Sequence, residues 1–212
     1  MTGVQRTVAL LLGIIVLILG LLVARVVRES PITAEQLARQ DLVLINSGRA
    51  LQTFSLTDQH NRPFVNSRLE GLWSLVFFGY TDCPDICPTT LSLLNRLKTK
   101  LDSAGVEPPV QYILVTVDPQ RDTPERLADY LSHVNPQFIG LSGSLDAIFA
   151  FARDLNSSFA RASLNDGNYR MDHSAYIALI NPEGEYQGFF RAPHDIITME
   201  NSFRAMLKGV TF

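Results

Sequence analysis

Leu72–Pro88 reads LWSLVFFGYTDCPDICP, a continuous apolar run that leads directly into a pair of cysteines. An apolar run of this length indicates a β-strand buried on both faces of a sheet. The leucines that follow, at positions 91, 94, 97 and 101, form one stripe of an amphipathic helix. We therefore predict a buried strand, a turn that carries Cys83 and Cys87, and a helix that begins at Pro88, since proline suits the first helical position.

The rest of the chain supplies the other elements of an α/β domain. We predict a strand, turn and strand over 54–64, a second buried strand over 111–117, helices over 124–134, 145–155 and 195–208, and a hairpin of strands 175–180 and 185–191 around the turn Asn181-Pro182-Glu183-Gly184. The order is β-α-β, then further helices, then β-β-α. This order is typical of a thioredoxin-like fold with an insertion between its halves.

Cys83 and Cys87 are the only cysteines of the chain, and their placement favours chemistry over a structural role. A disulfide across so short a loop would stabilise the fold by only about 2 kcal/mol. Inert buried thiols seldom lie in a proline-flanked turn between a strand and a helix. If the helix begins at Pro88, Cys87 caps it, and the free N–H groups and the helix dipole favour its thiolate. The negative charges of Asp82 and Asp85 oppose this effect. We expect a redox-active pair that can form a disulfide.

His173 is the third member of the predicted site. It lies just before the apolar run 175–180, and in a thioredoxin-like fold the loop ahead of this strand crosses opposite the helix end that carries the cysteines. Two thiolates and one imidazole suit Cu(I) and can also hold Cu(II), whereas structural zinc usually takes four protein ligands. We therefore predict that Cys83, Cys87 and His173 bind one copper ion per domain.

The other candidate ligands have simpler explanations. We expect Met171, two residues before His173, to pack near the site rather than to bind the metal. His60 is expected to be exposed in a polar turn, and His133 to meet free carbonyls at a helix end. His194, just before the last helix, is expected to cap it at the surface.

A second polar cluster, DPQRDTP from position 118, follows the second buried strand directly. Strand ends on this side of a parallel sheet are where sites form. Two interpretations carry equal weight. Asp118 and Asp122 support the metal ligands from a second layer of the site, or Thr123 caps the helix that starts at Pro124 while one aspartate binds Arg121.

The amino-terminal region predicts a single membrane-spanning helix. Thr7–Ala24 contains no charged residue and is flanked by Arg6, Arg25 and Arg28. A bilayer core needs about 20 apolar residues, and the apolar region of a cleaved signal peptide is usually shorter. We favour a retained anchor, although the flanking charges do not decide its orientation.

The chain of 212 residues is thus predicted to hold an anchor over 1–28, a linker over 29–48 and one globular domain over 49–212. A capping box from Thr33 to Gln36 predicts at most a short helix in the linker. The net charge is −3 and the pI is about 5.8, and the sequence has no basic run. Nucleic acid is therefore not an expected partner.

Taken together, these motifs resemble the Sco/SenC family, named for synthesis of cytochrome c oxidase. The motifs that carry the resemblance are Phe54–Phe64, Phe78–Thr81, Cys83–Pro88, Val117–Pro124 and Asp172–Ser174. The resemblance implies a thioredoxin-like domain with Cys83, Cys87 and His173 as copper ligands. It implies a single-pass protein of the inner membrane whose domain faces the periplasm, or the intermembrane space in mitochondria.

The resemblance also implies a partner, the copper-bearing subunit of cytochrome c oxidase, with another copper chaperone as a donor. Three functions use the same residues. The first is a metallochaperone that passes copper to the oxidase subunit by ligand exchange. The second is a thiol-disulfide oxidoreductase that keeps the cysteines of that subunit reduced, and the third is a copper or redox sensor.

Overall fold

An eight-stranded sheet forms the centre of the protein in the computed structural model, which describes residues 3–27, 32–164 and 168–212. The strands lie in the order β2 (Leu42–Ala50), β11 (Glu185–Phe190), β10 (Ile177–Ile180), β5 (Trp73–Gly79), β6 (Val110–Thr116), β7 (Ile139–Ser142), β3 (Ser55–Asp58) and β4 (Pro63–Val65). All but the first residue of β5 are buried, as its continuous apolar sequence predicts.

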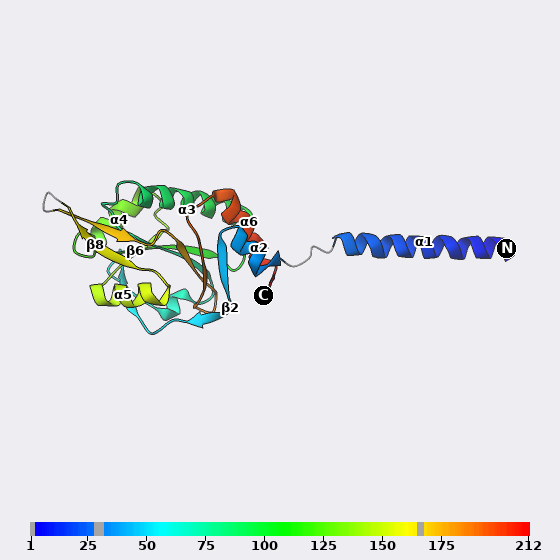
Figure 1. The fold of residues 1–212 in the computed structure, drawn as a ribbon, viewed down its shortest axis with the longest axis horizontal. Helices are drawn as coiled ribbons and strands as arrows, with labels where there is room; N and C mark the ends of the chain where they lie inside the picture. The colour runs from blue at the N-terminus through cyan, green and yellow to red at the C-terminus, as the bar shows by residue number, and fades with distance from the viewer. Residues whose placement is uncertain (1–2, 28–31, 165–167) are drawn as a thin grey trace.

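The middle of this sheet is a thioredoxin-like core. β5 and β6 are parallel, while β10 is antiparallel to both β5 and β11. α3 (Ile86–Ser103) packs beside α6 (Ile196–Leu207) on one side of the sheet, and α5 (Leu145–Asp154) lies on the other side (Figure 1). The leucine stripe of α3 is buried against this core, at positions 91, 94, 97 and 101.

Two parts of the insertion were not predicted from the sequence. β7 has four residues and is too short for its period to stand out. β8 (Phe159–Ser163) and β9 (Tyr169–His173) form a separate antiparallel hairpin, in which Phe159 lies opposite His173. The predicted helix over 124–134 is confirmed as α4 (Pro124–Ser132), and the short helix η1 (Asn66–Leu69) precedes β5.

The structure differs from the predicted linker over 29–48. The capping box of Thr33 is present and begins the short helix α2 (Ala34–Arg39), but the chain then enters the main sheet as β2, paired with β11. Leu37 and Leu42 are fully buried, so apolar burial draws this segment into the domain ahead of residue 49. A short parallel pair, β1 (Ile32–Thr33) with β12 (Val210–Thr211), adds to this end, and residues 28–31 lie outside the described part of the chain.

α1 (Gly3–Val27) contains the predicted apolar segment. Gly3–Leu22, 20 residues with a mean hydropathy of 2.3, is long and apolar enough to cross a membrane. A signal sequence near an amino terminus meets the same criteria, so the retained anchor stays a prediction.

Candidate metal centre

Both cysteines lie where β5 leads into α3. The helix begins at Ile86 with Asp85 at the cap position, so Cys87 occupies the first turn and not the cap, which corrects the predicted start at Pro88. Pro88 is still accommodated because the N–H groups of a first helical turn have no partner within the helix. Cys83 lies in the turn just before the helix, and both thiols are free and buried.

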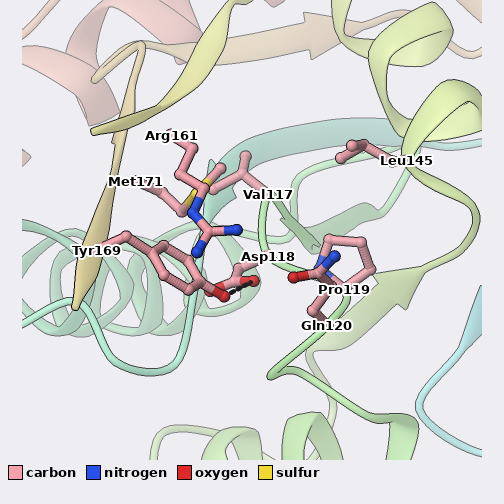
Figure 2. Close-up of a pocket in the computed structure, with 8 residues that line it drawn as sticks. All are labelled: Val117, Asp118, Pro119, Gln120, Leu145, Arg161, Tyr169 and Met171. Carbon is pink, nitrogen blue, oxygen red and sulfur yellow. Dashed lines mark hydrogen bonds between the residues drawn. The ribbon is translucent and has the colours of Figure 1, made fainter. Parts of the chain in front are cut away.

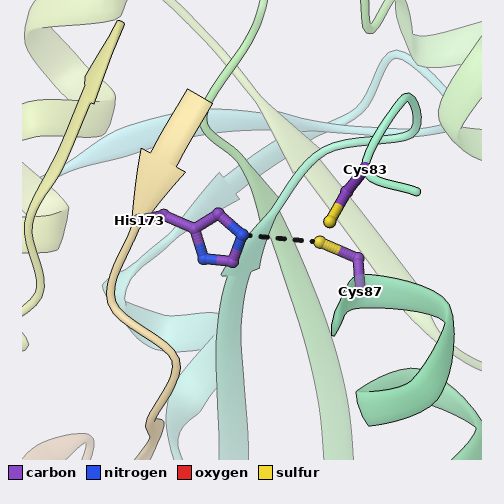
Figure 3. Close-up of side chains that lie close together, drawn as sticks. All are labelled: Cys83, Cys87 and His173. Carbon is purple, nitrogen blue, oxygen red and sulfur yellow. Dashed lines mark hydrogen bonds between the residues drawn. The ribbon is translucent and has the colours of Figure 1, made fainter. Parts of the chain in front are cut away.

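The structure brings the three predicted ligands together (Figure 3). The ligand atoms of Cys83, Cys87 and His173 all lie within 4.8 Å of one another, close enough to hold a metal ion. The Cys87 Sγ and His173 Nε2 atoms are 3.5 Å apart. His173 is the last residue of β9, so its side chain reaches the cysteines from the separate hairpin.

The second ring nitrogen of His173 fixes how the imidazole faces the cysteines. Nδ1 lies 3.1 Å from the carbonyl oxygen of Ser174, and because a carbonyl only accepts, Nδ1 carries the proton. Nε2 then presents its lone pair toward Cys87. Burial also lowers the pKa of His173, which favours the neutral imidazole that binds metals.

The rings of Phe77 and Tyr80 hold this imidazole on its edges. Their centroids lie 5.7 and 6.1 Å from the ring of His173, at interplanar angles of 80° and 88°. Neither aromatic residue was singled out from the sequence. Tyr80 lies within Phe78–Thr81, one of the motifs that carry the family resemblance, but no role of its own was predicted for it from the sequence.

The electrostatic setting of Cys87 corrects the predicted stabilisation of its thiolate. Burial raises the pKa of the Cys87 thiol, and the hydrogen bond with Cys83 raises it further. A backbone hydrogen bond with Tyr80 acts in the opposite direction, but the pKa stays raised because the side chain has lost its contact with water. In the metal-free protein Cys87 is therefore a protonated thiol at neutral pH, and a bound metal ion would displace its proton.

Asp122 stabilises the turn that carries Cys83 through hydrogen bonds to Thr81. Its buried carboxylate accepts hydrogen bonds from the Thr81 N–H at 3.0 Å, the Thr81 hydroxyl at 2.6 Å and the Thr116 hydroxyl at 2.6 Å. Burial raises the pKa of Asp122, although these three hydrogen bonds oppose the shift. Thr123 caps α4, with Pro124 in its first turn, as the local interpretation of this cluster predicts.

Asp118 lies in a neighbouring cluster at the end of β6. It pairs with Arg121, as predicted, and accepts a hydrogen bond from the Tyr169 hydroxyl at 3.0 Å. Asp118 and Tyr169 border a cavity of about 100 Å³ (Figure 2), which Met171 and Arg161 also line. Met171 is buried there, in agreement with the predicted packing role.

The remaining histidines have other partners or face solvent. His60 is exposed, and Nδ1 of His133 lies 2.8 Å from the carbonyl of Asp129 at the end of α4, both as predicted. His194 differs from the prediction, because it is half-buried and its Nε2 donates to the carbonyl of Ala175 at 2.8 Å. Asp195, the next residue, caps α6 instead.

The donor set fits copper. Soft thiolates and an imidazole are ligands that Cu(I) accepts at low coordination number. A closed structural zinc site usually needs a fourth protein ligand. Among the His, Cys, Asp and Glu side chains within 3–27, 32–164 and 168–212, only these three form such a group.

Comparisons with known proteins agree with this geometry. The family model described as SCO1/SenC matches residues 45–208. An SCO2-like protein of Rickettsia conorii is 33% identical over 194 residues, which cover 88% of this chain and 91% of the relative. The crystal structure of Arabidopsis thaliana ScoI with copper bound is 30% identical with a TM-score of 0.69, covering 74% of this chain and 98% of that one.

A bacterial structure gives the same result. Bradyrhizobium japonicum ScoI with copper bound is 34% identical with a TM-score of 0.62, and the match covers 74% of this chain and 99% of that one. The family match begins within β2 and ends just after α6, so it includes the other seven strands of the main sheet and most of β2. The chain therefore belongs to the SCO1/SenC family and has its thioredoxin-like fold.

Proposed function

We propose that this protein is a copper metallochaperone that binds one copper ion through Cys83, Cys87 and His173 and delivers it during assembly of cytochrome c oxidase. The observation that carries the proposal is the convergence of two thiols and an imidazole within 4.8 Å. Two relatives with this fold have been solved with copper bound. A more distant structure with this fold is described as a member of the Sco family of cytochrome c oxidase assembly proteins.

The geometry suits an ion that must leave again. Three protein ligands leave a coordination position open, so a thiolate or imidazole of the acceptor can bind before the donor ligands dissociate. His173 lies at the end of a hairpin outside the main sheet, so it can be released without breaking the core. Copper is the cargo in this proposal, and the protein residues bind it and then release it to the acceptor.

The apolar helix α1 supports delivery at a membrane. α1 is apolar enough to span, and it would keep the domain beside a membrane-bound acceptor, the copper-bearing oxidase subunit. We place the anchor at residues 1–28 in the inner membrane, with the domain in the periplasm or the mitochondrial intermembrane space. A second copper chaperone would act as donor.

Asp122 and Asp118 act in this proposal as supports of the site. Asp122 fixes Thr81, two residues before Cys83, through both its backbone and its hydroxyl. Asp118 holds Tyr169 on the strand that carries His173. Partners of this kind orient metal ligands and typically change metal affinity when they are removed.

A copper titration of the purified full-length protein in detergent tests the proposal, with the wild type beside His173→Ala. We expect thiolate-to-Cu(II) charge-transfer absorption at one copper per chain, and weaker binding with altered absorption in the variant. Ser157→Ala, a change at a buried residue outside the ligand set, serves as a control and should titrate as the wild type does. Absence of binding, or equal affinity without His173, would contradict the proposal.

A thiol-disulfide oxidoreductase is the second candidate. The observation that favours it is the contact between the two free thiols at the start of α3, at the carboxyl end of β5. This function predicts that reduced protein opens the disulfide of an oxidase-subunit peptide at equal rates with and without His173. A copper or redox sensor would use the same residues and differ only in its partner.

A further inference from the structure

The metal centre is assembled from two arms that belong to distant parts of the chain. One arm is the segment 80–87, a turn that leads into the start of α3 and carries both cysteines, and the other is β9, which carries His173. β9 pairs only with β8, in a two-stranded sheet separate from the eight-stranded one. Side-chain contacts, and not the hydrogen bonds of the main sheet, must therefore hold the second arm against the first.

Arg121 contacts both arms from the loop after β6. On the hairpin side, its guanidinium lies 4.0 Å from the ring centroid of Tyr169, and Nη1 donates to the Tyr169 carbonyl at 3.4 Å. On the turn side, it lies 5.6 Å from the ring centroid of Tyr80 and 3.5 Å from the carboxylate of Asp82. One side chain thus joins β9 to the residues that precede Cys83.

Asp118 keeps the guanidinium in this place. It is buried, and it binds both Nε of Arg121 and the hydroxyl of Tyr169. Tyr169 and His173 are four residues apart on one strand, so they point to the same face of the hairpin. Tyr80, which Arg121 contacts, also packs edge-on against the imidazole of His173.

We propose that Arg121 is a positioning residue that holds β9, and with it His173, against the cysteine turn, so that the three ligands are close together before copper binds. This inference rests on the proposed copper site. A ligand held in place by the fold does not have to be ordered by the metal, which raises affinity. A guanidinium fits this role because its planar fork can stack on aromatic rings and bind carboxylates at the same time.

A double-mutant cycle on the full-length protein in detergent tests the role, with copper affinity as the measurement. We expect Arg121→Ala to bind copper about 10- to 100-fold more weakly than the wild type. In a His173→Ala background the same change should have no further effect, because Arg121 acts through the histidine. Arg121→Lys should not restore affinity, because an ammonium keeps the charge but loses the fork.

Arg170→Ala is the matched control. Arg170 is an exposed arginine of β9 that pairs with Asp172 at 3.0 Å. Arg170→Ala changes the net charge by the same amount as Arg121→Ala and should leave copper affinity unchanged. An equal loss from Arg121→Ala in both backgrounds would overturn the proposal, because the residue would then act through charge or overall stability. Full affinity in Arg121→Lys would overturn it as well.

A measurement without metal separates this inference from the proposed function. If the wild type binds no copper, the metallochaperone fails, but amide hydrogen exchange still decides whether Arg121 holds the hairpin. Arg121→Ala should speed exchange in β8 and β9 and leave β5 unchanged. Unaltered exchange in the hairpin would overturn the positioning role.

Discussion

Asp122 shows at the scale of one residue how the cysteine turn is held. Asp122→Ala would leave the Thr81 N–H and two threonine hydroxyls without their acceptor. Since a buried unsatisfied donor costs about 1–3 kcal/mol, we expect the free energy of unfolding to fall by about 2 kcal/mol or more. Asp122→Asn can keep these contacts if its oxygen accepts from the Thr81 N–H and the Thr116 hydroxyl while its NH2 group donates to the Thr81 hydroxyl. It should therefore lower the free energy of unfolding much less. Denaturant unfolding of the two variants measures the difference.

The pH dependence gives a second measurement of the same residue. Burial raises the pKa of Asp122 above its ordinary value of 3.8, so the folded state holds this proton more tightly than the unfolded chain. The free energy of unfolding should therefore fall as the pH rises from that value through the folded pKa. The difference between wild type and Asp122→Asn should show this fall, and parallel pH profiles would contradict the assignment.

Gly79 is required by the close approach of Cys87. A Cβ atom at this position would lie 2.9 Å from Cys87 Sγ and 3.0 Å from the ring of Phe77. We expect Gly79→Ala to lower the free energy of unfolding by about 1–3 kcal/mol and to weaken copper binding, because the thiol must move. Gly140→Ala is the control, since its Cβ would lie 2.9 Å from a Leu131 methyl group instead. Equal copper affinities in the two variants would contradict this explanation.

At the scale of elements, the sequence predicts best where one local pattern decides the structure. β5 and α3 follow from an apolar run and a leucine stripe, and both are present. The start of α3 was misplaced by two residues because proline fits any position of a first turn, so it does not mark the cap. The raised pKa of Cys87, which opposes the predicted stabilisation of its thiolate, has a different origin, because burial is a tertiary property that the local sequence does not carry.

The hairpin of β8 and β9, which carries His173, likewise depends on tertiary contacts that a local sequence pattern does not predict. Charged side chains alternate with Tyr169, Met171 and His173 along β9, which is a signal of period two over only five residues. The contacts that place the hairpin come from Arg121 and Asp118, about 50 residues earlier in the chain. The ligands, and Asp118 as one candidate support, could therefore be predicted from residue chemistry and fold order, whereas the contacts of Arg121 with the hairpin could not.

At the scale of the whole molecule, the segment before residue 49 decides where the domain begins. Its polar composition predicts a tether, yet β2 forms the edge of the main sheet, and Leu37 and Leu42 are fully buried. A chain that starts at Ile32 keeps these contacts, and we expect it to be soluble with a single cooperative unfolding transition.

A chain that starts at Arg49 loses two buried leucines, each worth about 1.5–3 kcal/mol, and exposes the edge of β11. It should therefore be less stable by about 3 kcal/mol or more. Thermal unfolding of the two chains, with Leu37→Ala in the longer one as an intermediate case, measures this. Equal unfolding temperatures would mean that β2 adds nothing to the fold and that the domain begins at residue 49.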